Sequence, residues 1–85
     1  MRYQMEKIDI KSDYRYVVAT MDEVPMFVKL DAFKKDYCLV DNITIASKAD
    51  SREAVEALMQ DYKRKTRDWR DFAILKIEVS YRIID

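Results

Sequence analysis

The chain of 85 residues contains no glycine and no histidine, and it has one cysteine and one proline. Without glycine we expect no phosphate-binding or dinucleotide-binding loop, because both need backbone that approaches phosphate closely or adopts positive φ. Without histidine there is no imidazole base, no serine–histidine pair and no ordinary zinc site. We therefore expect a protein that is not an enzyme and that uses neither a cofactor nor a metal.

Charge of one sign is not in excess either, because 16 basic and 16 acidic residues cancel. A neutral chain has no overall field to attract nucleic acid or an anionic membrane, although local patches remain. No apolar run approaches the ~20 residues of a membrane span, and the first residues lack the apolar core of a signal peptide. The single cysteine, Cys38, excludes an intrachain disulfide, and we expect it to be buried and inert in a reducing cytoplasm.

The clearest pattern is the alternation of apolar and polar side chains in residues 72–84. It predicts a long strand with one buried face and one solvent face. The buried face is expected to carry Ala73, Leu75, Ile77, Val79, Tyr81 and Ile83. The solvent face is expected to carry Lys76, Glu78, Ser80 and Arg82.

Three shorter segments, residues 14–21, 24–30 and 37–41, are rich in β-branched and aromatic residues and predict further strands. Asp22-Glu23 predicts the turn between the first two, and Phe33 is expected to tuck under the polar connection before the third. Ile8 and Ile10 suggest an additional short edge strand, followed by a polar turn at residues 11–13. Residues 43–46 are interpreted as either a small strand or the lead-in to a helix.

Residues 50–67 predict one amphipathic helix, with Asp50 as its N-cap and Glu53 completing a capping box. Asp61 and Lys65 are spaced to form an i,i+4 ion pair. The stripe expected to face the sheet holds Ser51, Val55, Leu58, Met59, Tyr62, Thr66 and Trp69.

Strands followed by one helix and a last strand predict an α+β fold, in the order β-β-β-α-β, as a single domain over residues 1–85. We expect an antiparallel sheet of four to five strands with the helix on one face, packed on Leu75, Ile77, Val79 and Val28. A helix of ~27 Å covers only one side of such a sheet. The reverse side should then be available for contact.

That uncovered face is the first candidate site, for a protein partner or a second copy. Aromatic rings beside Arg and Lys are typical of protein interfaces, although an ordinary solvated face with a few rings is the simpler interpretation. The face is expected to carry Tyr14, Tyr16, Phe27, Lys29, Lys76, Glu78 and Arg82.

The second candidate site is the basic end of the helix, with Arg64, Arg67, Trp69 and Arg70. Cations interleaved with aromatic rings can hold single-stranded nucleic acid or a nucleotide. The simpler interpretation is that these cations complement the helix dipole while the rings join the core.

Five short pieces carry a resemblance: Tyr16-Val17-Val18, Pro25-Met26-Phe27-Val28, Tyr37-x-Leu39-Val40-Asp41, Ala46, and Ser51-Arg52-Glu53-Ala54. Over about half of the chain, this pattern resembles small uncharacterised proteins encoded by phages and prophages of Gram-positive bacteria. The resemblance implies no activity and no catalytic residue. It implies a cytoplasmic accessory protein that binds a host protein, including components of host defence.

Overall fold

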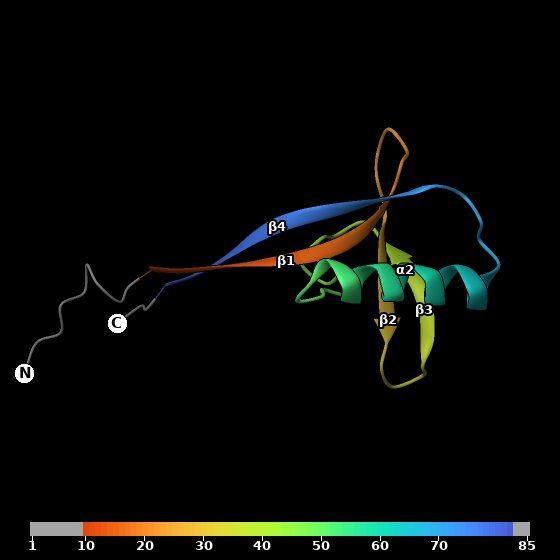
Figure 1. The fold of residues 1–85 in the computed structure, drawn as a ribbon, viewed down its shortest axis with the longest axis horizontal. Coiled ribbons are helices and arrows are strands. Elements are labelled where there is room, and N and C mark those ends of the chain that lie inside the picture. The colour runs from red at the N-terminus through yellow and green to blue at the C-terminus, as the bar shows by residue number, and fades with distance from the viewer. Residues whose placement is uncertain (1–9, 83–85) are drawn as a thin grey trace, which may run out of the picture.

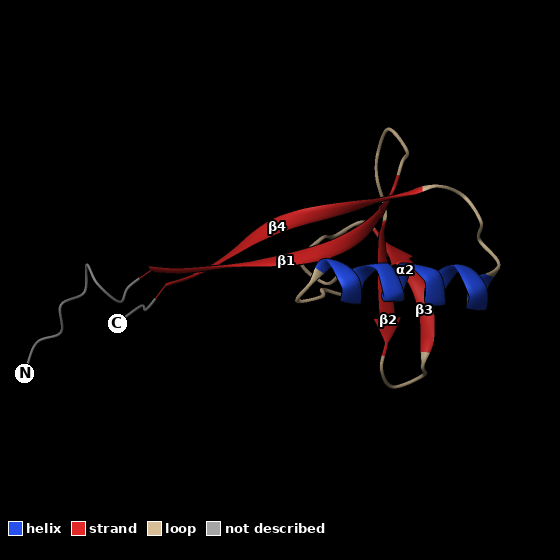
Figure 2. Cartoon of the chain, viewed as in Figure 1, coloured by secondary structure: helices blue, strands red, loops and turns tan. Residues whose placement is uncertain are grey.

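The computed structural model describes residues 10–82, and the side chains of residues 13–81. Residues 1–9, with Ile8 of the expected additional strand, and residues 83–85 lie outside the described part. The four described strands form one antiparallel sheet in the order β3-β2-β1-β4, with a single helix, so the α+β prediction is confirmed (Figure 1, Figure 2). The elements are β1 (Ile10–Thr20), β2 (Phe27–Asp31), β3 (Asp36–Val40), α2 (Arg52–Thr66) and β4 (Phe72–Arg82).

Strands β1 and β4 form the longest ladder, which runs without interruption from Ile10↔Arg82 to Thr20↔Phe72. The polar turn expected at residues 11–13 is wrong, because these residues belong to β1 and pair with residues 79–81. Pairing with a long partner strand gives their backbone groups ladder hydrogen bonds, which outweighs the local turn preference of Lys, Ser and Asp.

Strands β1 and β2, in contrast, meet at only one residue pair, Ala19↔Phe27. Beyond this pair they diverge, and Figure 1 shows β2 and β3 crossing the direction of β1 and β4. Where β1 and β2 diverge, residues 47–49, which precede the helix, form hydrogen bonds to both strands. Tyr16 and Ala49 exchange two backbone hydrogen bonds of 2.9 Å, and the Ser47 amide donates to the Val28 carbonyl at 3.1 Å. Residues 43–46 form a turn that leads into this segment.

The N-cap of helix α2 lies one residue later in the chain than predicted. It is Ser51, in an extended conformation, and the Ser51 hydroxyl accepts from the Ala54 amide at 3.1 Å. The Asp50 cap is therefore wrong: Asp50 instead lies 3.3 Å from Nε of Arg15. Both residue types cap well, so sequence alone could not separate them. The expected Asp61–Lys65 ion pair is confirmed at 3.4 Å.

Within residues 10–82, two residues other than glycine have a positive φ. Arg67 ends the helix at φ 58°, and Lys35 takes φ 57° in the β2–β3 turn. Glycine normally fills such positions, because a side chain there costs about 1–2 kcal/mol. The fold accepts this cost at both turns.

Two apolar clusters lie on opposite faces of the sheet. On the helix side, Val18, Val28, Val55 and Tyr62 are buried, with partly buried neighbours that include Leu58, Met59, Phe72 and Ile74. On the reverse side, Val17, Ala19, Phe27 and Ala46 are buried, with Val40, Ile43 and Ile77 against them.

The predicted packing of the helix on Val28 is confirmed, but its packing on Leu75, Ile77 and Val79 is wrong. The β4 residues on the helix side are the even-numbered Phe72 and Ile74, whereas Ile77 joins the reverse cluster. The first residues of β4 are apolar on both faces, so alternation could not tell which face the helix covers. The expectation that the reverse side is uncovered is also wrong for the part of the sheet that carries the helix on its other face. There Ala46 and Ile43 pack on the reverse side.

Three further side chains are more exposed than expected. Trp69 is 65% exposed because the helix ends at Thr66, before the core stripe reaches it. Phe33 is 98% exposed, in a turn whose amides bond to Asp31. Cys38 is exposed on β3, at the edge of the sheet.

Candidate functional site

The distal part of the β1–β4 ladder extends beyond the other described strands and the helix (Figure 1). We call residues 10–15 of β1 and 77–82 of β4 the arm. Figure 2 shows the arm as a two-stranded ribbon with no helix over it, and the molecule is 56 Å long but only 29 Å across. An isolated two-stranded ribbon is marginally stable in water, because stability requires three or more strands with an apolar face, or a helix packed on the strands.

One face of the arm carries an apolar row that runs out from the reverse cluster. Ile77 and Val79 are half-buried, and Tyr81 is 56% exposed. Beside this row, Arg15 contacts Asp13 at 2.8 Å, and the hydrogen bond from Arg15 lowers the pKa of Asp13. The row therefore combines apolar side chains with a charged margin, which is the usual composition of an interface.

The other face of the arm carries Tyr14, which is 52% exposed, and next to it Lys76 and Glu78. The Lys76 Nζ lies 4.8 Å from the centre of the Tyr14 ring, a cation–π contact on the surface. In the ladder Tyr14 is opposite Glu78, and Tyr16 is opposite Lys76.

The first predicted site is thus divided between two faces. Tyr14, Tyr16, Lys76 and Glu78 lie on the helix side of the sheet, with Tyr16 packed against the helix-side cluster. Phe27 lies on the reverse side and is buried, and Lys29 is half-buried. Arg82 ends β4, and its side chain lies outside the described part. The prediction of one shared face away from the helix is wrong, because the helix covers the even-numbered side of β4.

The outer edge of β4 is a feature that the sequence interpretation missed. Within the described residues β4 has one neighbouring strand, β1, so its other edge faces outward. An edge of this length is a template for pairing with another strand. The length of residues 72–84 indicated a long strand, but only the strand order places it at the edge.

The second predicted site holds cations that already have acidic partners. Arg64 contacts Asp61 at 2.6 Å, and Arg70 donates to both carboxylate oxygens of Asp68 at 2.8 and 2.7 Å. These bonds hold the pKa of Asp68 well below its usual range. Arg67 and Trp69 lie beside them, both exposed, in the connection after the helix. The sequence pattern predicts Lys65 as the partner of Asp61, but it does not predict the pairs Arg64–Asp61 and Arg70–Asp68.

Two buried or half-buried tyrosines are joined to the same aspartates. The Tyr37 hydroxyl donates to Asp61 at 2.6 Å, and the Tyr62 hydroxyl donates to Asp68 at 2.9 Å. Burial, followed by the bond to Asp61, raises the pKa of Tyr37 to about 12. A phenol with so high a pKa is a poor general base or acid at neutral pH, so these pairs fit a structural role.

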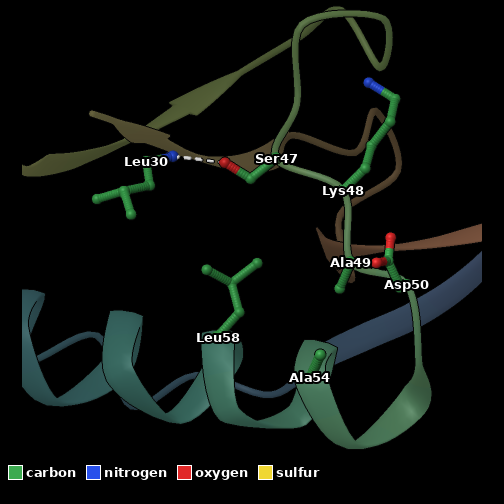
Figure 3. A pocket seen from close by; sticks show the side chains of 7 residues that line it. All are labelled: Leu30, Ser47, Lys48, Ala49, Asp50, Ala54 and Leu58. Carbon is green, nitrogen blue, oxygen red and sulfur yellow. Dashed lines mark hydrogen bonds between the residues drawn. The ribbon is translucent and has the colours of Figure 1, made fainter. Parts of the chain in front are cut away.

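A pocket of about 440 Å³ lies between the helix and the segment that precedes it (Figure 3). Its charged groups are already engaged: Lys48 Nζ donates to the carbonyls of Thr44 and Ala46, and Asp50 pairs with Arg15. The Ser47 hydroxyl accepts from the Leu30 amide at 2.7 Å. The pocket therefore presents few unused polar groups to a ligand.

Residues 10–82 contain no cluster of three acidic or cysteine side chains placed to ligate a metal. Among these residues, no helix has the length and apolar character needed to cross a bilayer. No protein-family model, curated protein or solved structure matches the chain.

Proposed function

We propose that this chain is a small non-enzymatic binding protein that acts through protein–protein contact, and that the arm is its binding site. The observation that carries the proposal is the partly exposed apolar row of β4, on a ribbon that no other described element covers.

The apolar surface that is open to a partner lies on the arm rather than over the whole sheet. The rest of the described fold, which we call the body, buries apolar side chains on both faces of the sheet, under α2 on one side and under Ala46 and Ile43 on the other. Among the described residues, no element covers the arm in this way, so burial of Val79 and Tyr81 by a partner would add stability at about 25 cal/mol per Å². Exposed apolar surface with a polar margin is typical of sites at which a protein binds a partner.

The resemblance of residues 16–54 to phage and prophage proteins extends this proposal. On that basis the protein is a phage-encoded accessory protein in the host cytoplasm, and its partner is a host factor, such as a component of host defence, or its own copy. The tyrosines at 14 and 81 supply large amphipathic contact area of the kind that such interfaces use.

The alternative, a nucleic-acid or nucleotide binder at Arg64, Arg67, Trp69 and Arg70, has less support. Arg64 and Arg70 are bound to Asp61 and Asp68, and an anionic ligand would have to compete with these carboxylates. Oligonucleotide binding that weakens steeply with salt, and that Arg70→Ala abolishes, would favour the alternative over our proposal.

A photo-crosslinking amino acid at position 81 tests the proposal in a Gram-positive cell. The matched control carries the same group at Gln60, an exposed residue of α2 away from the arm. We expect adducts with polypeptide, either foreign or a second copy, from position 81 and not from position 60. Equal adducts from both positions, or none from either, would remove the arm as the binding site.

A further inference from the structure

We propose that the partner is a second copy of this chain, and that the two copies pair antiparallel along the outer edges of their β4 strands, centred on Ile77. This inference rests on the proposed function, since it names the occupant of the same site. The product is a continuous eight-stranded sheet, four strands from each copy, with the two bodies at opposite ends of the joined strands.

The backbone of β4 is oriented for this pairing. In β1, Tyr16 directs both its N–H and its C=O toward Ala49, away from β4. Groups alternate in direction along an antiparallel strand, so the odd-numbered residues of β1 bond to β4. Their ladder partners are the odd residues of β4, such as Ile77 opposite Arg15. The even residues Ile74, Lys76 and Glu78 therefore direct their N–H and C=O groups to the outer edge.

The side chains select one register. In two-fold pairing about Ile77, Lys76 of each copy lies directly opposite Glu78 of the other, which forms two cross-strand ion pairs. If the centre moves to residue 76, Lys76 meets Lys76, and if it moves to 78, Glu78 meets Glu78. Like charges directly opposite each other are destabilising, whereas opposite charges stabilise the pairing. Charge complementarity thus favours a second copy in this register.

Both charges are available for such pairing. Neither Lys76 nor Glu78 has an ion pair with another described residue, and both side chains are exposed. The contact of Lys76 with the Tyr14 ring leaves its ammonium group at the surface.

In the same register, the apolar residues of one β4 strand lie opposite apolar residues of the partner's β4 strand. On the reverse side of the sheet, Ile77 faces Ile77 and Leu75 faces Val79 across the two-fold axis. Leu75 is 38% exposed, although it lies next to the reverse cluster. Pairing also places each arm beside the body-proximal half of the partner's β4. The arm then belongs to a sheet of four strands at that point, which removes the weakness of a two-stranded ribbon.

The first test measures mass in solution by sedimentation over a range of concentrations. We expect the native chain to reach twice its monomer mass of 10.2 kDa. Glu78→Lys sets Lys76 against a second lysine in both pairs and should weaken the dimer roughly tenfold or more. The double exchange Lys76→Glu with Glu78→Lys restores opposite charges and should restore the dimer. Glu56→Lys, on the exposed side of α2, is the control for net charge.

The second test is oxidative crosslinking in a Cys38→Ser background, which removes the exposed native thiol. Ile77→Cys places two thiols directly opposite each other in a non-hydrogen-bonded pair, where Cα atoms lie ~4.5 Å apart, within the range of a disulfide. Val79→Cys is the matched control, because residue 79 faces residue 75 of the partner. We expect rapid formation of covalent dimer at position 77 only.

The outcomes separate this inference from the proposed function. The β4 pairing is overturned if the chain is monomeric at every concentration. It is also overturned if Glu78→Lys leaves the dimer affinity unchanged and the cysteines at positions 77 and 79 form covalent dimer at the same rate. If position 81 still crosslinks to a foreign polypeptide in that case, the arm remains a binding site and only its occupant is different. Failure of position 81 to crosslink selectively, together with a monomer, removes both proposals.

Discussion

The Tyr37 hydroxyl donates a 2.6 Å hydrogen bond to Oδ2 of Asp61 and thereby joins β3, at the edge of the sheet, to helix α2. The Tyr37 ring also packs edge-to-face on Tyr62, at 5.5 Å between ring centres. Tyr62 makes the same kind of contact with Phe72 of β4 at 5.4 Å. This row of three rings connects both outer strands of the described sheet to the helix between them.

Removal of the Tyr37 hydroxyl should weaken this connection. We expect Tyr37→Phe to lower the free energy of unfolding by about 1–2 kcal/mol, because a partly buried hydrogen bond to a carboxylate is lost while the ring remains. Urea denaturation followed by circular dichroism measures the change. Tyr14→Phe is the matched control, since the Tyr14 hydroxyl has no hydrogen-bond partner among the described residues, and an equal loss in both variants would contradict the expectation.

Ionisation of the Tyr37 hydroxyl should also lower the stability of the fold at alkaline pH. The pKa of Tyr37 is raised to about 12 by burial and by its bond to Asp61, whereas an unfolded tyrosine has a pKa of ~10. A group with a raised folded-state pKa gives stability that is complete below the unfolded value and is lost as pH rises through the folded one. Stability should therefore fall between about pH 10 and 12. Denaturation curves in this range should show a smaller fall for Tyr37→Phe, and parallel falls would argue that another group is responsible.

Acid should act through Asp68, whose pKa is held far below its usual range by Arg70 and then by Tyr62. The stability from a lowered pKa is complete above the unfolded value, ~3.9, and is lost as pH falls below it. Asp68→Asn should be less stable than the native chain at neutral pH. Its stability should also change less between about pH 5 and 2, as measured by thermal unfolding at several pH values. Identical acid profiles would show that the ion pair with Arg70 is screened and energetically neutral.

The position of the helix cap can be tested with two adjacent residues. Ser51→Ala removes the hydroxyl that accepts from the Ala54 amide and should cost about 1 kcal/mol. Asp50→Ala removes only an exposed ion pair with Arg15 and should cost less than ~0.5 kcal/mol. Chemical denaturation distinguishes the two, and the reverse order would restore Asp50 as the cap.

Neighbouring residues of β4 test which face the helix covers. Ile74 packs with the helix-side cluster, whereas Leu75 points to the other face and is 38% exposed. We expect Ile74→Ala to cost roughly 2 kcal/mol and Leu75→Ala roughly 1 kcal/mol or less in the monomer. The measurement is made at a concentration below any dimerisation, so that burial between copies does not add to the cost at Leu75.

The amino-acid sequence by itself determined the elements and their type. Alternation in residues 72–84 specified a strand, which the described residues form over Phe72–Arg82. The 3.6-residue periodicity of residues 50–67 specified a helix, which runs over Arg52–Thr66, and the spacing of Asp61 and Lys65 specified their ion pair. These features depend on neighbours within a few residues, so local patterns are sufficient to identify them.

Only the tertiary structure decided which face of β4 the helix covers, how β1 leaves β2 after one residue pair, and that β4 lies at the sheet edge. Alternation has a period of two and does not say which side is inward when Phe72 and Ile74 are apolar as well as Ala73 and Leu75. Strand order and the position of the arm depend on contacts between residues far apart in the chain. The candidate site consists of these long-range relationships, which is why its predicted residues were divided between two faces.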